Sequence, residues 1–476
     1  MMTILLGALD QTIVSVALPS IARQLGGFDW MAWVVSGYLI AATVVTPLYG
    51  KFSDLFGRRR VLCTAIIVFM LASVACALAR SMPELVVARV LQGAGGGGLI
   101  TMAQAVVADV VPVRDRGRYQ SYISIVWVVA SLLGPLVGGL LTQYLSWPWI
   151  FWINLPVGLL TLALVQGSLR ALPVRRGAPR IDGTGALLLL GGLTALLIPI
   201  TRVGQGVGWN DAHNLWGWAF AAALLAVFAR QQRRHPEPML PMALLANPVV
   251  VACCAMMLLL FFNFIALSVL VPLRLQMVVG ASATDAAVRL LPMTLTMPIA
   301  AFVGGRWLTR SGRAMPPQRL GVALVPLALL AVSLLPPTGW AAMASLAVVG
   351  AGMGLQVSTS LISVQQAVPV RLVGTATGLA AFSRLLGGAM GIALLSSIAL
   401  LLLRAQLPPG THGVGGEALS VMFDSTPGAS PATDAAFRQL MRVCALVALA
   451  SVWFVSRVPD RPLTDPAAAA PVALVD

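Results

Sequence analysis

One carboxylate stands out in this sequence because of where it lies. Asp10 falls within a run from Met2 to Leu25 that is otherwise almost entirely apolar or small. A charged side chain at the middle of a bilayer costs about 2.5 to 3.5 kcal/mol, so it is kept mainly where it has a task. A buried carboxylate beside a cation can take up and release a proton as its surroundings change. We therefore expect Asp10 to carry protons.

The expected partner of Asp10 is Arg89, in the segment VARVLQGAGGGG, about five residues into the fourth predicted span. A static ion pair that fixes the first span against the fourth is the alternative. The three histidines, His213, His235 and His412, all fall in predicted loops. No imidazole is therefore expected to carry protons within the membrane. Arg384 lies about ten residues into its span, and its position suits a functional cation and a structural pair equally.

The composition indicates what surrounds these residues. The chain is 58% hydrophobic, only 10% charged and has a mean hydropathy of +0.89, whereas soluble proteins are about 25% charged. Apolar runs of roughly 18 residues or more, long enough to cross about 30 Å of hydrocarbon, recur along almost the whole sequence. We expect an all-α integral membrane protein without a soluble domain.

Fourteen spans are predicted. They cover residues 2–24, 31–50, 61–79, 84–108, 119–142, 149–169, 184–201, 215–229, 249–273, 284–308, 319–336, 340–364, 374–403 and 437–456. The spans 184–201 and 215–229 are short, and the segment between them is rich in glycine and polar residues. Twelve spans are therefore the alternative.

Basic residues predict the orientation. Alternate loops and the C-terminal tail hold twenty-one of the 31 Lys and Arg residues, and cytoplasmic loops carry the excess of such residues. Both termini are therefore predicted to be cytoplasmic, in the inner membrane of a bacterium. No basic residue precedes the first span. Either the later loops set the topology or the true start lies upstream, and we favour a truncated start.

Several classes of function are disfavoured. The net charge of +15 is spread over the predicted inner loops, which suits an anionic lipid leaflet better than a nucleic acid. The five cysteines lie inside predicted spans without metal-ligand spacing, so no metal site is expected. The sequence lacks GxxxxGK[ST] and HExxH, which disfavours an enzyme and leaves the proton gradient, rather than a cofactor, as the energy source. GAGGGG at 93–98 satisfies GxGxxG, but it lies in a predicted span and suits close helix packing better.

Five ordered segments within residues 9–158 carry a family resemblance. GKFSDLFGRRR at 50–60 resembles the signature loop of the major facilitator superfamily. RVLQGAGGG resembles that superfamily's fourth-helix motif, and GPLVGG resembles its antiporter motif. LDQTIVSVALP and WPWIFWINLPVG are similar to stretches typical of the fourteen-helix drug/proton antiporter family.

The resemblance implies a major facilitator fold, in which two pseudo-symmetric six-helix bundles are joined by two additional helices. The implied divisions are an N-terminal bundle at 1–170, a linker with two spans at 171–235, a C-terminal bundle at 236–458 and a disordered cytoplasmic tail at 459–476. GRWLTRSGR at 305–313 resembles a decayed copy of the loop at 50–58, with Thr309 in the place of Asp54. Such a repeat is what two related halves would leave.

The resemblance also implies proton-driven efflux by alternating access. It links Asp10 and Arg89 to proton coupling, and Asp54, Arg58 and Arg59 to closing one face. Asp109 and Arg116 are expected to complete that charged group. The conformational loop is thus predicted to comprise Gly50, Asp54, Gly57, Arg58, Arg59, Asp109 and Arg116, and the antiporter motif Gly134, Pro135, Gly138 and Gly139. This sequence departs from the family pattern at Ser15, Ser121, Ala130 and Pro148, and the last replaces a usual arginine.

The expected partners are the bilayer, protons and a small lipophilic substrate. Nothing in the sequence specifies a periplasmic adaptor. A drug or antibiotic exporter fits best, and an exporter of a specific metabolite, siderophore or lipid is the alternative. With one deep acid, the substrate is expected to be neutral or weakly charged, or to share Asp10 in turn with the proton. Candidate cavity residues are Gln11, Tyr38, Gln104, Phe261, Asn263, Phe264, Gln356, Gln365 and Arg384.

Overall fold

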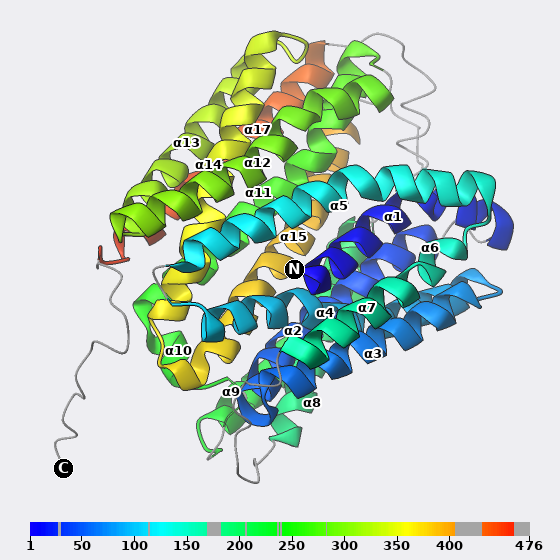
Figure 1. Cartoon of the computed structure of the whole chain (residues 1–476). Coiled ribbons are helices and arrows are strands. Elements are labelled where there is room, and N and C mark those ends of the chain that lie inside the picture. The colour runs from blue at the N-terminus through cyan, green and yellow to red at the C-terminus, as the bar shows by residue number, and fades with distance from the viewer. Residues whose placement is uncertain are drawn as a thin grey trace.

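The computed structural model describes residues 1–26, 30–112, 115–168, 182–204, 207–235, 238, 240–281, 283–404 and 431–460. Long α-helices dominate this part of the chain (Figure 1). The helices are α1 (Met2–Leu25), α2 (Met31–Phe56), α3 (Arg58–Ala77), α4 (Met82–Val110), α5 (Arg116–Tyr144), α6 (Trp149–Trp152), α7 (Asn154–Ser168), α8 (Gly183–Gly204), α9 (Ala212–Gln232), α10 (Met242–Ala246), α11 (Pro248–Val279), α12 (Ala283–Ser311), α13 (Met315–Leu334), α14 (Trp340–Gln366), α15 (Val373–Arg404) and α17 (Pro431–Ser456), with a short 3₁₀ helix at Val370–Leu372.

Within the described residues, 12 helices are long and apolar enough to cross a membrane. The predicted spans 2–24 and 374–403 correspond to α1 and α15, which are not among these helices. The integral membrane character of the chain is therefore clear, whereas a total of fourteen spans remains a prediction. Most of the predicted tail, 461–476, lies outside the described residues.

Two sets of helices repeat the same packing pattern. In the first set α4 packs against α2 and α3, and α1 packs against α5; in the second set α14 packs against α12 and α13, and α11 packs against α15. The predicted repeat falls at equivalent corners. Gly57 separates α2 from α3 with φ of 88°, and Gly312 follows α12 with φ of 65°, backbone angles that suit glycine because it has no Cβ.

The glycine-rich stretch of α4 brings three helices together. A Cβ on Gly93 would lie 2.3 Å from the carbonyl oxygen of Tyr38 in α2, and one on Gly95 would lie 2.5 Å from the backbone nitrogen of Phe69 in α3. The stretch lies inside one continuous helix. It therefore serves close helix packing and not the turn that a dinucleotide site requires.

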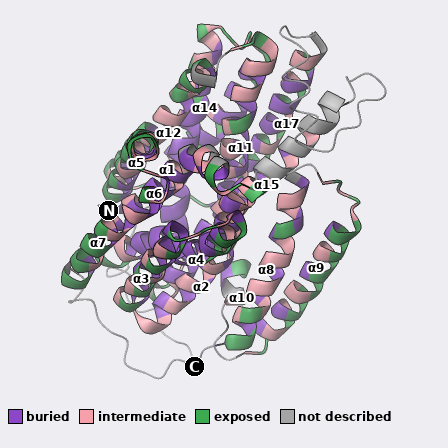
Figure 2. Ribbon diagram, turned by 90° about the vertical axis from the view of Figure 1, so that its right-hand side faces the viewer, coloured by how far each residue is buried: buried purple, intermediate pink, exposed green. Residues whose placement is uncertain are grey.

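Of the two additional helices, α8 lies beside both sets and α9 packs on α8. α8 packs against α9 and also against α2 and α15 (Figure 2). Much of α9 remains exposed, including Trp216 and Phe220, as suits a helix at the rim of a membrane protein. α8 therefore covers the region where α2 of the first set meets α15 of the second.

A buried carboxylate joins the beginning of α8 to the end of α9. Asp182 accepts hydrogen bonds from the Gly185 amide (2.7 Å), Gln231 Nε2 (2.6 Å) and Gln232 Nε2 (2.6 Å). Burial raises the pKa of the Asp182 carboxyl, but these donors outweigh it and hold that pKa below its ordinary value. His235 Nε2 lies 3.9 Å from the same carboxylate.

This arrangement predicts a loss of stability in acid. A group whose pKa is lowered on folding stabilises the protein above its unfolded pKa, and the contribution is lost as the pH falls through the folded pKa. We expect the thermal stability of the detergent-solubilised protein to fall below about pH 4. Asp182→Asn should remove part of this dependence, whereas Asp115→Asn, at an exposed position, should leave it unchanged. Identical pH curves for the wild type and Asp182→Asn would contradict the assignment.

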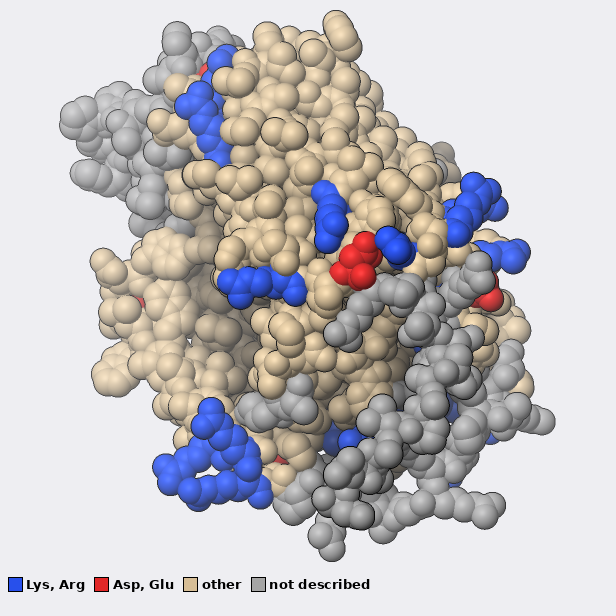
Figure 3. Space-filling view, turned by 90° about the vertical axis from the view of Figure 1, so that its left-hand side faces the viewer, with Lys and Arg blue, Asp and Glu red and all other residues tan. Residues whose placement is uncertain are grey.

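The surface is apolar with scattered basic groups. On the face shown in Figure 3, Lys and Arg side chains outnumber acidic ones and stand in separate groups rather than in one patch. Trp30, Trp149, Trp216 and Trp340 are exposed near helix beginnings, as interfacial tryptophans are. Trp147, in contrast, is 5% exposed and packs edge-on against Phe151.

Candidate proton-coupling site and closure contact

Asp10 is fully buried and its carboxylate is saturated with donors. Arg89 Nη1 lies 2.8 Å from Asp10 Oδ2, and both side chains are almost completely inaccessible. The other oxygen, Oδ1, accepts hydrogen bonds from Gln92 Nε2 (2.9 Å) and Asn154 Nδ2 (2.8 Å). This cluster of Asp10, Arg89, Gln92 and Asn154, called the Asp10 cluster below, pairs one negative with one positive charge.

Four helices supply the Asp10 cluster and its surroundings. Asp10 comes from α1, Arg89 and Gln92 from adjacent turns of α4, and Asn154 from the first position of α7. Ser73 of α3 accepts from both amides, at 2.7 Å from Gln92 and 3.3 Å from Asn154. Each polar side chain thus finds a partner inside the bundle, as burial requires.

Arg89 is held from two further sides. Its Nη1 donates to Gln92 Oε1 (2.6 Å), and its guanidinium lies 4.2 Å from the ring centroid of Tyr38. Cation–π contact stabilises a buried guanidinium by about 2 kcal/mol when water is excluded. Tyr38 was predicted to line a substrate cavity, but it is 1% exposed and covers Arg89 instead.

Gln92, Asn154 and Ser73 were not among the predicted site residues. The segments RVLQGAGGG and WPWIFWINLPVG contain Gln92 and Asn154, so the signal available was a polar side chain within an apolar span. The turn at Ile153 between α6 and α7 is what directs Asn154 to Asp10. Only the fold establishes that contact.

The chemistry open to this cluster is proton exchange with rearrangement. Protonation of Asp10 would leave the Arg89 charge buried without its counter-ion. Removing one member of a buried ion pair costs about 3 to 5 kcal/mol. Uptake or release of one proton would therefore be sufficient to shift an equilibrium between two helix arrangements.

The antiporter motif lies against the next turn of α1. Thr12 Oγ1 donates to the Ala130 carbonyl at 3.1 Å, and a Cβ on Gly134 would lie 1.9 Å from the same hydroxyl. Gly138 packs against Ile13, whereas a Cβ on Gly139 would have nothing within 4 Å. The side chain of Pro135 lies outside the described residues. α5 therefore contacts α1 closely, two residues beyond Asp10.

At one end of the molecule the two sets of helices meet through Asp54. Its carboxylate accepts from the amides of Gly374 (3.1 Å) and Thr375 (2.7 Å), and from the Thr375 hydroxyl (2.7 Å). Arg58 lies 2.7 Å from Asp54 and 2.7 Å from Asp109. One arginine thus joins α2, α3 and α4 beside α15.

A second junction at this end involves α5 and α12. A Cβ on Gly117 would lie 2.1 Å from the Gly305 carbonyl oxygen, and Ser121 Oγ donates to the Phe302 carbonyl at 2.9 Å. A Cβ on Gly50 would likewise lie 2.6 Å from the Gly374 carbonyl oxygen. We call the Gly50–Gly374, Asp54–Thr375 and Gly117–Gly305 contacts together the closure contact.

Two of the predicted loop residues lie in surroundings different from those of Arg58. Arg59 was expected to close the face with Arg58, but it forms no ion pair with a described residue because Arg58 alone reaches both acids. Arg116 was expected to complete the charged group. It donates to the carbonyl oxygens of Ala108 (2.5 Å) and Val111 (3.2 Å), and so caps the end of α4 beside Asp109.

The predicted cavity residues divide into two groups. Gln104, Asn263 and Gln356 are buried, like Tyr38, and Gln365 bonds to Thr377. Gln11, Phe261, Phe264 and Arg384 keep part of their surface accessible. The second group is therefore better placed to meet a substrate in this conformation.

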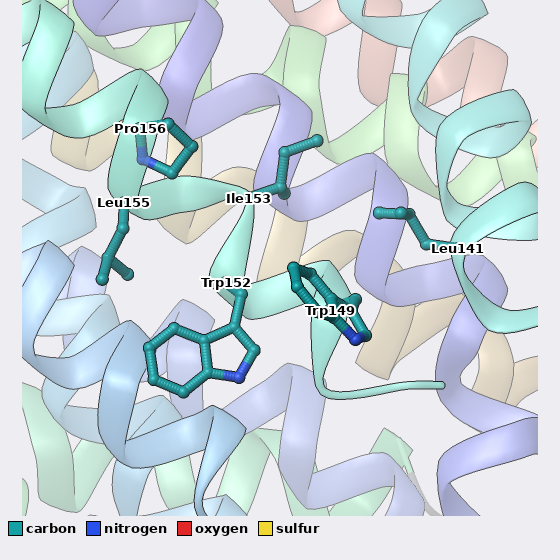
Figure 4. Close-up of a pocket in the computed structure, with 6 residues that line it drawn as sticks. All are labelled: Leu141, Trp149, Trp152, Ile153, Leu155 and Pro156. Atoms are coloured by element: carbon teal, nitrogen blue, oxygen red, sulfur yellow. The ribbon is translucent and has the colours of Figure 1, made fainter. Parts of the chain in front are cut away.

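A separate apolar pocket of about 500 Å³ lies between α5 and the α6–α7 corner (Figure 4). Its lining residues are Leu141, Trp149, Trp152, Ile153, Leu155 and Pro156. None of these residues has an ionisable side chain, so this pocket is distinct from the Asp10 cluster.

The comparison with known families decides the class of protein. The Major Facilitator Superfamily model matches residues 1–392. The chain belongs to this superfamily. Members are transporters rather than enzymes.

The relatives of this superfamily member include named transporters. An uncharacterized MFS-type transporter of Mycobacterium tuberculosis is 37% identical over 392 residues, which are 82% of this chain and 57% of that protein. This chain therefore spans little more than half the length of that relative. The multidrug transporter protein MdtP of Bacillus subtilis is 31% identical over 394 residues, 82% of this chain and 72% of that protein.

Solved structures agree on the fold. The human organic anion transporter MFSD10 matches with a TM-score of 0.64 at 16% sequence identity, covering 95% of this chain and 97% of that one. At this identity the likeness concerns the fold alone. The chain thus has the superfamily's all-helical, multi-pass membrane architecture.

Proposed function

We propose that this transporter exports small lipophilic compounds, drugs or antibiotics among them, in exchange for protons. The observation that carries the proposal is the buried Asp10–Arg89 pair, at 2.8 Å and with no exposed carboxylate surface. A titratable acid enclosed within a membrane bundle is a feature of proton-driven transporters. The multidrug transporter named among the relatives supports the substrate class.

The proposed mechanism connects the Asp10 cluster to the closure contact through α5. Proton exchange at Asp10 would change how α1 sits against α5 at Thr12 and Gly134. α5 also carries Gly117, which meets Gly305 of α12 in the other set of helices. A shift of α5 along α1 would therefore open or close the face that holds the closure contact, which is alternating access.

We further propose that this face is cytoplasmic, that both termini lie on that side, and that the membrane is the bacterial inner membrane. The basic residues of the alternate loops support this orientation. Labelling of intact cells with a membrane-impermeant thiol reagent, after a cysteine is placed at exposed positions such as Asp115 and Trp340, tests this orientation. Asp115→Cys should be protected from the reagent, and Trp340→Cys should react.

Growth inhibition of an efflux-deficient bacterium expressing the protein tests the substrate class. Raised resistance to several unrelated lipophilic compounds is the expected result. In inside-out vesicles, the same compounds should accumulate when the interior is acidic, and collapse of the pH difference should stop the accumulation. Resistance to a single compound would instead favour export of a specific metabolite, and accumulation that ignores the pH difference would contradict proton coupling.

A further inference from the structure

The charges deep inside the bundle do not cancel. Asp10 and Arg89 neutralise each other. Arg384 lies about 16 Å along α15 from its beginning, and it forms no ion pair or hydrogen bond with any residue that the structure describes. The interior of the described bundle therefore carries one uncompensated positive charge.

Other arginines in the spans have different surroundings. Arg274 is buried, but it is paired with Asp434 at 2.8 Å. Arg442 lies on the exposed side of α17, as do Leu446 and Leu449. α17 begins at 431, six residues before the predicted span, so Arg442 lies about three turns into this helix. Its long side chain can extend along the surface toward water.

Arg384 points toward the interior of the transporter. Phe382, Leu386 and Ala389, on the opposite side of α15, pack in the cluster formed with α2 and α8. The face that carries Arg384 also carries Gly387 and Gly391, which contact α11. Part of the Arg384 surface nevertheless remains accessible.

Aromatic rings of α11 lie beside this cation. The Arg384 guanidinium is 5.5 Å from the ring centroid of Phe261, which stacks edge-on with Phe264 at 6.0 Å. Contact with a ring compensates only part of the cost of placing a guanidinium in a membrane, and arginine cannot lose its proton to avoid that cost. An anionic group offered by a ligand would compensate the rest.

Arg384 and the rings of Phe261 and Phe264 favour anionic compounds, and the Asp10 cluster disfavours cationic ones. A cationic substrate would need a deep acid, but Asp10 is fully enclosed and already accepts from three side chains. We propose that the substrates of this transporter are amphipathic organic anions, with the anionic group held by Arg384 and the apolar body against Phe261 and Phe264. This inference rests on the proposed export function, because it assumes that the compounds bound at Arg384 are the ones exported. It replaces the sequence-based expectation of neutral or weakly charged compounds.

Three probes that share one ring system test this inference by binding to the purified protein in detergent. They are naphthalene-2-sulfonate, naphthalene-2-sulfonamide and (2-naphthylmethyl)trimethylammonium, which are anionic, neutral and cationic. We expect the sulfonate to bind about 10- to 100-fold more tightly than the other two, since charge-assisted hydrogen bonds are roughly twice as strong as neutral ones. Arg384→Gln should abolish this preference and leave the weak binding of the sulfonamide unchanged.

Two further variants separate charge recognition from folding. Arg384→Lys keeps the charge and should keep most of the preference for the sulfonate. Arg442→Gln removes an arginine from an exposed position of another span and should change nothing. Wild-type protein that binds the three probes equally, or an Arg384→Gln protein that still prefers the sulfonate, would overturn the inference.

Transport of the same probes distinguishes this inference from the proposed function. If wild-type protein binds the sulfonate selectively but a pH difference moves none of the probes, proton-driven export fails and the anion site stands. If a pH difference drives export of the sulfonamide while the sulfonate is neither bound nor moved, the export function stands and the anion site fails.

Discussion

Asp10→Asn is expected to reduce pH-driven substrate accumulation in vesicles to the level of vesicles that lack the protein. The amide cannot exchange a proton, so nothing in the cluster would respond to the imposed pH difference. Substrate flux down its own concentration gradient should continue, because that flux needs no proton. Accumulation and downhill exchange of one fluorescent substrate, measured in the same preparation, check both parts.

A double variant separates proton coupling from a merely structural ion pair. Asp10→Asn alone leaves Arg89 uncompensated and should lower the free energy of unfolding by about 3 to 5 kcal/mol. Asp10→Asn with Arg89→Gln removes both charges and should recover much of that stability. If the double variant also recovers pH-driven accumulation, Asp10 and Arg89 only fix α1 against α4, and the coupling assignment is wrong.

Gly117→Val is expected to produce the second large effect, by preventing closure of one face. Any Cβ at this position would lie 2.1 Å from the Gly305 carbonyl oxygen, a backbone atom that cannot move aside alone. Overpacking costs about 1 to 3 kcal/mol, which would shift the equilibrium between closed and open forms about 5- to 150-fold. Transport should fall accordingly, while the fold of each set of helices is retained.

The distance between the two sets of helices gives a direct measurement. Spin labels at Asp115 and Arg310, both exposed near this end, should show longer separations in Gly117→Val than in the wild type. Gly139→Val is the matched control on the same helix, since a Cβ there has nothing within 4 Å. Transport by the Gly117→Val protein at the wild-type rate would show that the closure contact is not required.

The two experiments address opposite ends of one proposed connection. Asp10 lies two residues from Thr12, which contacts α5, and α5 carries Gly117 to the other set of helices. If the connection operates, Asp10→Asn should make the separation between positions 115 and 310 insensitive to pH. In the wild type the separation should change with pH.

Some features of this protein follow from the sequence by itself. Apolar runs, a lone deep acid and five ordered motifs predicted an all-helical membrane transporter of this superfamily, because the cost of burying charge and unpaired backbone groups in lipid leaves a long helix few alternatives. The positions of Asp10 and Arg89 within their spans, and of Asp54 in the loop after the second span, were likewise readable from hydropathy. The number of spans that cross the membrane was not: the segments 184–201 and 215–229 were the weakest in the sequence, yet α8 and α9 are among the 12 helices of the described chain that are long and apolar enough to cross, and α1 and α15 are not.

Tertiary structure alone decided which side chains meet. Gln92 and Asn154 are 62 residues apart in the sequence, yet both donate to Asp10 Oδ1 because α4 and α7 pack around α1. Arg58 and Arg59 are neighbours with the same chemistry, but helix geometry directs only Arg58 toward Asp54 and Asp109. Tyr38 and Arg384 were equal candidates for a cavity, and packing enclosed one and left the other partly accessible. Hydropathy reports how deep a residue lies in the membrane, whereas its direction around the helix and its partner depend on neighbours that are distant in the chain.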